Sequence, residues 1–218
     1  MDVRTLLLLM LLFIAGCAKE GRQEPSPAAQ PAAVSAGLEV VEYTDDYGYT
    51  ERYQRRIADG VREGRYERIA PDGTIREAAF YLADTLHGAR ILFYPSGDTL
   101  SVEHYQRGAF QGPFRQYYEN GTLQLAGQYD ANEATGKWLQ YYADGALMEI
   151  VNFEGNVENG PFVEYFPNGN LKAEGRYLDG DNEHGLLKLY NESGALIRKM
   201  ECERGVCQTV WSAEGRKR

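Results

Sequence analysis

Glycines recur at a fixed spacing along most of this chain. One series comprises Gly64, Gly88, Gly112, Gly136, Gly160 and Gly185. A second series comprises Gly73, Gly97, Gly121, Gly145, Gly169 and Gly194. Each series advances by 24 residues four times and then by 25. A fixed period of this length is typical of one small supersecondary unit stacked repeatedly, so it constrains the architecture strongly and the chemistry weakly.

Each unit predicts a β-hairpin followed by a connecting loop. In the unit that begins at Gly112, residues 114–118 are rich in β-forming side chains, and Asn120-Gly121 is a turn signal because this pair readily adopts positive φ. Residues 123–129 then alternate between apolar and polar, and the polar residues 130–135 predict a loop. The other units match at a bulky residue five positions after the first glycine: Ile69, Phe93, Tyr117, Tyr141, Tyr165 and Tyr190.

These units predict an all-β fold, an elongated antiparallel β-hairpin repeat array that forms a twisted or rolled meander. We expect six to seven units of about 24 residues, the seventh being a degenerate unit before Gly64, within a repeat domain at 37–211. Residues 212–218 form a basic C-terminal tail in this interpretation.

The repeated pattern is Gly-x-aromatic-x-x-Tyr-Tyr-x-Asn/Asp-Gly-x-Leu, followed by a tyrosine and a loop that ends in glycine. It resembles the bacterial variant of the MORN repeat, as in YwqK-type antitoxins of toxin–antitoxin systems, over residues 64–201. The resemblance implies hairpin repeats, no catalysis and interaction with other macromolecules. The first unit departs from the pattern, because Ile69-Ala70 stands where Tyr-Tyr is usual.

The beginning of the chain reads as a secretory signal. Arg4 precedes an apolar run at 6–14, which is too short to span a bilayer as a helix. The run ends in Ile14-Ala15-Gly16-Cys17, which resembles the bacterial lipobox; the alternative is an ordinary signal peptide with a coincidental cysteine. We expect a lipoprotein signal peptide at 1–16 and acyl chains on Cys17.

A tether and an acidic body complete this interpretation. Residues 17–36 contain Pro25, Pro27 and Pro31 and few apolar side chains, so they predict a lipidated disordered tether. The net charge of −9 argues against nucleic acid as a partner. The expected location is the bacterial cell envelope, lipid-anchored, at the outer membrane.

Two further cysteines, Cys202 and Cys207, lie near the end of the array. An oxidising envelope compartment permits a disulfide between them, across a tight hairpin that contains Gly205. Cys202 occupies the position where the earlier units carry an aromatic residue: Tyr81, Tyr105, Tyr129, Phe153 and Tyr177. A redox-active or metal-binding pair is the alternative, but no histidine lies nearby to complete a metal site.

Aromatic residues supply the candidate binding face. If exposed in register, they could stack sugar rings or bind a partner's side chains; alternatively they pack against neighbouring units. The candidates are Tyr94, Tyr118, Trp138, Tyr142 and Phe166.

The sequence offers little for catalysis, and we expect no enzyme activity, no cofactor and no metal. His87 and His184 occupy equivalent loop positions four units apart and so cannot share a metal. Glu77 and Glu103 could meet across strands, although no cleft is recognisable. The acidic loop 179–183 lacks the pattern of an EF-hand and is better explained as an insertion.

Three functional hypotheses remain. The first is a membrane-anchored lipoprotein whose repeats bind or scaffold an unidentified protein partner. The second is a carbohydrate- or peptidoglycan-binding module that uses the aromatic residues. The third, implied by the resemblance, is an antitoxin- or immunity-like protein.

Overall fold

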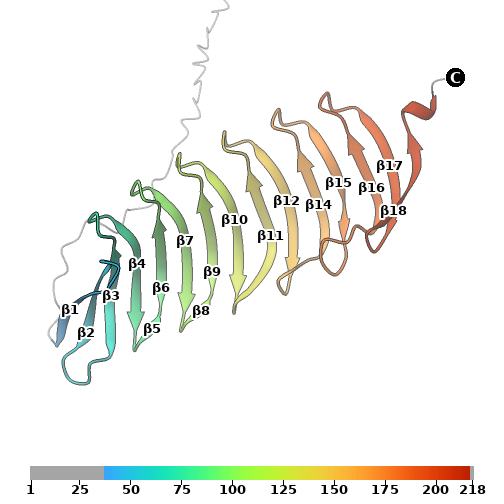
Figure 1. Cartoon of the computed structure of the whole chain (residues 1–218). Helices are drawn as coiled ribbons and strands as arrows, with labels where there is room; N and C mark the ends of the chain where they lie inside the picture. Colours follow the sequence, from blue (N-terminus) through green and yellow to red (C-terminus); the bar gives the residue numbers. More distant parts are fainter. Residues whose placement is uncertain (1–36, 217–218) are drawn as a thin grey trace, which may run out of the picture. The chain divides into compact units, whose positions relative to one another are not determined.

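Hairpins follow one another in chain order through the whole of the computed structural model, which describes residues 37–216. The expected signal peptide at 1–16, Cys17 and the tether at 17–36 lie outside the described residues, as do the last two residues of the expected tail. Within the described part, 18 strands form one open antiparallel sheet, and each long strand pairs with the long strands before and after it (Figure 1). The predicted all-β hairpin repeat array is confirmed.

The long strands of the first half alternate with turns of similar length. They are β1 (Leu38–Thr44), β2 (Thr50–Arg56), β3 (Arg62–Ile69), β4 (Ile75–Leu82), β6 (Gly88–Phe93), β7 (Thr99–Gln106), β9 (Gly112–Tyr117) and β10 (Leu123–Asp130). The second half continues with β11 (Glu133–Tyr141), β12 (Leu147–Glu154), β14 (Gly160–Tyr165), β15 (Leu171–Tyr177), β16 (Gly185–Tyr190), β17 (Leu196–Glu203) and β18 (Val206–Ser212). Three two-residue strands, β5 (Thr85–Leu86), β8 (Ala109–Phe110) and β13 (Val157–Glu158), lie in the connections, and a 3₁₀ turn, η2 (Glu214–Arg216), follows β18.

The turn within each hairpin has the same backbone geometry in every unit. In the hairpin of β9 and β10, the Gly121 N–H donates to the carbonyl of Tyr118, and the Tyr118 N–H donates to the carbonyl of Thr122. The degenerate first hairpin repeats both bonds between Asp45, Gly48 and Tyr49. The turn glycines adopt φ between 79° and 92°, a region that disfavours side chains, and they are Gly48, Gly73, Gly97, Gly121, Gly145, Gly169 and Gly194. The 24-residue glycine spacing therefore reflects one repeated turn.

The connections between hairpins are shorter than the sequence predicts. The expected polar loop at 130–135 is instead a two-residue turn at Ala131-Asn132, with φ of 47° and 72°, and the flanking strands pair up to it. Two positive φ values identify the type I′ geometry, which matches the twist of antiparallel strands. The acidic loop 179–183 contains such a turn at Asp179-Gly180, followed by a bridge between Tyr177 and Glu183.

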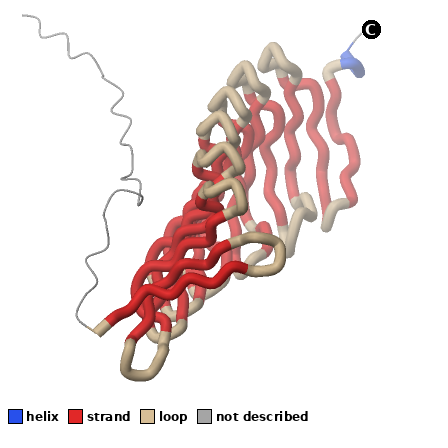
Figure 2. Tube along the Cα trace, turned by 60° about the vertical axis from the view of Figure 1, so that its left-hand side comes forward, coloured by secondary structure: helices blue, strands red, loops and turns tan. Residues whose placement is uncertain are grey.

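The sheet is twisted, and its turns line up in rows at the two ends of the strands (Figure 2). Burial is concentrated on one side, here called the core face, which carries Tyr66, Trp138, Phe162, Leu187 and Cys202. Register places these side chains together: Trp138 lies opposite Val151 and Phe162 opposite Gly175. A buried cluster runs along this face from β11 to β17. Contacts between neighbouring units therefore supply the core of a single-layer sheet.

Candidate functional site

Four of the five predicted aromatic residues lie at the first position of the hairpin turns and are half-buried. The hydroxyl of Tyr94 donates to the carbonyl of Tyr117 over 2.8 Å. The Tyr118 and Tyr142 hydroxyls repeat this bond to the carbonyls of Tyr141 and Tyr165, at the same distance. Phe166 occupies the next turn and has no hydroxyl. These rings join one unit to the next, so their polar atoms are already engaged.

Trp138 is buried, with 5 % of its surface exposed, and cannot form part of an exposed aromatic row. Its ring centroid lies 5.2 Å from that of Tyr129, 5.5 Å from Phe153 and 5.7 Å from Phe114. A side chain on Gly127 would overlap the indole ring. Trp138 therefore packs against neighbouring strands, because its position on β11 lies on the core face.

A pocket of about 290 Å³ opens on the core face beside Trp138. Its wall contains both apolar or aromatic and polar side chains. Its lining is Leu125, Tyr129, Ala134, Trp138, Gln140, Glu149, Val151, Phe153, Asn156 and Glu158. The volume is close to the lower end for ligand sites, so it fits one side chain or a small molecule.

Two carboxyl groups in this pocket have raised pKa values. Burial is the largest cause for Glu149, and the carboxylates of Glu164 and Glu158 raise its pKa further, while the charge of Lys172 opposes them. The amino group of Lys172 is itself paired with Glu164 over 2.6 Å. Burial and Asp181 raise the pKa of Glu158. The pocket is therefore a region of negative potential with an aromatic wall.

A different arrangement occupies the core face between β4 and β7. The Arg90 guanidinium donates to Glu77 over 2.7 Å and to Glu103 over 3.0 Å, and the Tyr105 hydroxyl also donates to Glu103. Glu103 is buried, with 7 % of its surface exposed. The two carboxylates that the sequence suggested could meet are thus separated and neutralised by an arginine, which does not resemble a glycosidase pair. Burial and Glu103 raise the pKa of Tyr105 to about 12.

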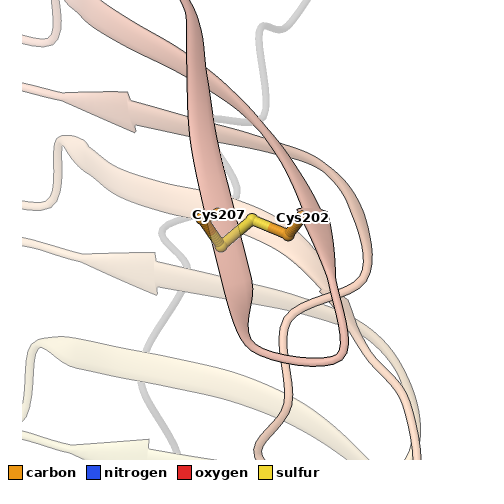
Figure 3. The surroundings of a disulfide bond; sticks show 2 residues. All are labelled: Cys202 and Cys207. Carbon is orange, nitrogen blue, oxygen red and sulfur yellow. A yellow bond between two sulfur atoms is a disulfide. The ribbon is translucent and has the colours of Figure 1, made fainter.

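The last hairpin is crosslinked. Cys202 and Cys207 lie opposite each other on β17 and β18, with Cα atoms 4.0 Å apart and an S–S distance of 2.00 Å (Figure 3). Cys202 is 3 % exposed and belongs to the buried cluster of the core face. For so short a loop, a disulfide contributes about 2 kcal/mol in the chain-entropy account. The bond therefore strengthens a terminal unit that has a neighbour on one side only.

No group of three or more histidine, cysteine or acidic side chains in 37–216 is arranged to hold a metal ion. Over the same residues, no helix has the length and apolar character needed to cross a bilayer. Cys17, the predicted lipidation site, lies outside them.

The sequence did not single out Glu149 and Glu158. A signal was present: Glu77 and Glu149 both stand 13 residues after the first glycine of their units, Gly64 and Gly136. The residue that neutralises Glu77 is Arg90, and the equivalent residue three units later is Phe162. Comparing charges at equivalent repeat positions would have identified Glu149 as a carboxylate without its cation.

Comparison with known families supports the repeat assignment. Residues 110–131, 134–154 and 158–179 each match the family described as MORN repeat variant. A search of curated proteins found no match. Repeats of this family generally serve as modules that interact with proteins or membranes. Three central units of this chain are therefore similar to MORN-variant repeats.

Proposed function

We propose that this chain is a lipid-anchored protein of the bacterial cell envelope whose repeat sheet binds a partner protein. The observation that carries the protein-binding role is the pocket on the core face. It combines an aromatic wall with carboxylates on a sheet whose central units are similar to MORN-variant repeats. A meander of similar units also presents a long surface, which suits an extended partner. The proposal assigns no catalysis, cofactor or nucleic acid to the chain.

The anchoring part of the proposal is supported by the sequence around Cys17, where a short apolar run ends in Ala15-Gly16-Cys17. Several acyl chains on one cysteine would hold the chain stably at a membrane, since each buried methylene contributes about 0.8 kcal/mol. Replacement of Cys17 by alanine should move the protein from the membrane fraction to the soluble fraction and abolish palmitate labelling. Membrane association and labelling that survive Cys17→Ala would contradict anchoring at this residue.

The binding part is tested by photocrosslinking from the pocket. A photoreactive amino acid replaces Gln140, which lines the pocket, and in a matched control replaces Gln128, which is exposed on the opposite face of β10. The proposal expects one dominant crosslinked protein from position 140 and a much weaker one from position 128. Equal crosslinking from both positions would contradict a binding role for the core face.

A carbohydrate-binding role is the competing outcome of this experiment. Trp138 is buried and so offers no flat stacking surface to a sugar ring, and the hydroxyls of Tyr118 and Tyr142 are already bonded to backbone carbonyls. If added peptidoglycan fragments abolish the crosslink at position 140, the glycan hypothesis replaces the protein one. If the crosslinked protein is a toxin, the antitoxin-like role implied by the family resemblance gains support.

A further inference from the structure

The repeats provide an internal comparison for the pocket. Glu77 and Glu149 occupy the same position in units that lie 72 residues apart, and both face the core side of the sheet. The Arg90 guanidinium lies 2.7 Å from Glu77, reaching it from the next hairpin. At the position equivalent to Arg90 stands Phe162, which is 2 % exposed and stacks on Tyr177. The sequence therefore places a phenylalanine, and no cation, at the position from which Arg90 reaches Glu77.

The positive charge that acts on Glu149, that of Lys172, is paired with a different carboxylate. Glu164 lies directly opposite Glu149 on β14, so two carboxylates of like charge face each other. Lys172 is the basic residue nearby, and its amino group lies 2.6 Å from Glu164. Glu158, which also lines the pocket, adds a further negative charge, and Lys172 acts on Glu149 in the opposite direction. The pocket therefore retains an excess of negative charge after Lys172 is counted.

The remaining wall suits a planar cation. Tyr129 and Phe153, which are half-buried, line the pocket together with the two glutamates and the buried Trp138. An aromatic face attracts a cation through its quadrupole, and a guanidinium can also stack on it.

We propose that this pocket binds an arginine side chain of the partner protein. That arginine would pair with Glu149 and Glu158, as Arg90 pairs with Glu77 and Glu103 in the same chain. The inference rests on the proposed function, because the arginine is supplied by a protein partner. Arginine is favoured over lysine because its planar fork can bond a carboxylate while lying on an aromatic ring. The volume of about 290 Å³ admits one such side chain.

The test uses N-acetyl-arginine-N-methylamide as the probe, with the matching citrulline derivative as a neutral control of the same shape. Tryptophan fluorescence reports on Trp138 in a Trp211→Phe background, which leaves one tryptophan in the chain. We expect the arginine probe to bind saturably and the citrulline probe not to bind. Glu149→Gln should weaken the arginine probe by about tenfold or more. The matched control, Glu119→Gln at an exposed turn, should leave its affinity unchanged.

Three results would overturn the inference: no binding of the arginine probe, equal binding of the citrulline probe, or unchanged binding by Glu149→Gln. Glu158→Gln provides a second variant, and circular dichroism shows whether each variant keeps its sheet. A lysine probe that binds more tightly than arginine would contradict the choice of arginine.

The crosslinking experiment separates this inference from the proposed function. If the photoreactive residue at position 140 crosslinks a partner equally well with and without Glu149→Gln, the protein-binding role stands and the arginine pocket fails. If the arginine probe binds but no partner is captured, the pocket stands and the proposed protein-binding role fails.

Discussion

The two halves of the core face solve the same packing problem with different chemistry. From β3 to β7, here called the charged segment, an arginine and two glutamates lie at the centre of the face. From β9 to β17, here called the aromatic segment, Trp138, Phe162 and Leu187 occupy the position that Arg90 holds. The turns and strand pairings are nevertheless the same in both. The comparison shows that turn glycines and backbone hydrogen bonds maintain the architecture, while the core positions are free to differ.

The largest expected effect concerns the charged segment. Arg90→Met would leave Glu103 buried without its cation and remove the partner of Glu77. Loss of one member of a buried ion pair costs about 3–5 kcal/mol in general, and urea unfolding would measure the loss in this variant. Arg55→Met is the matched control, because its pair with Glu39 is exposed and contributes about 1 kcal/mol or less. If both variants lose the same stability, the charged segment is not held together by Arg90.

The next effect concerns the aromatic segment. Gly127→Ala would place a methyl group against the indole ring of Trp138, and overpacking of this kind costs about 1–3 kcal/mol. The equivalent position in the charged segment is Ala79, a buried alanine for which the residue corresponding to Trp138 is Arg90. The penalty should shrink when Gly127→Ala is measured in a Trp138→Leu background, as a double-mutant cycle would reveal. An additive cycle would show that the glycine is not required by the tryptophan.

A smaller effect is expected where the units of the aromatic segment are joined. Tyr118→Phe removes the hydroxyl that donates to the Tyr141 carbonyl and should cost about 1 kcal/mol. The reverse change, Phe166→Tyr, would supply a hydroxyl in the one aromatic turn of this set that lacks it, and a gain in thermal stability is expected. Unchanged stability in both variants would mean that these bonds merely replace bonds to water.

The smallest effect is the pH dependence that Glu149 contributes. Its folded pKa is raised above the ordinary value of 4.5, chiefly by burial and then by Glu164 and Glu158. The folded state therefore holds a proton that the unfolded state has lost, and stability falls as pH rises from the ordinary value through the raised one. Glu149→Gln should remove this part of the dependence of stability on pH. The variant should be more stable than the parent at neutral pH, and the difference in stability should shrink in acid.

Glu174 provides the opposite sign in the same titration. Hydrogen bonds from Lys188 and Tyr190 lower its pKa, so its contribution is present above the ordinary value and is lost as pH falls. Both the parent and Glu149→Gln contain Glu174, so its contribution cancels when their stabilities are compared at the same pH. A difference that grows in acid would contradict the assignment of the raised pKa to Glu149.

Part of this protein is determined by the sequence alone. The glycine spacing and the residues before each turn glycine predict the hairpins, their number and their order, because these are local requirements of a repeated turn. The length of the connections was mispredicted, because the polar residues at 130–135 indicate a loop while sheet twist favours a two-residue turn at Ala131-Asn132.

The tertiary structure decided what lies on the core face. Whether Trp138 is exposed depends on the preceding hairpin, since Gly127 and Tyr129, which pack against its ring, come from β10. The meeting of Glu149 with Glu164 likewise depends on register between separate hairpins. Local patterns specify each hairpin, but only the stacking of hairpins determines which charges are neutralised and which face a pocket.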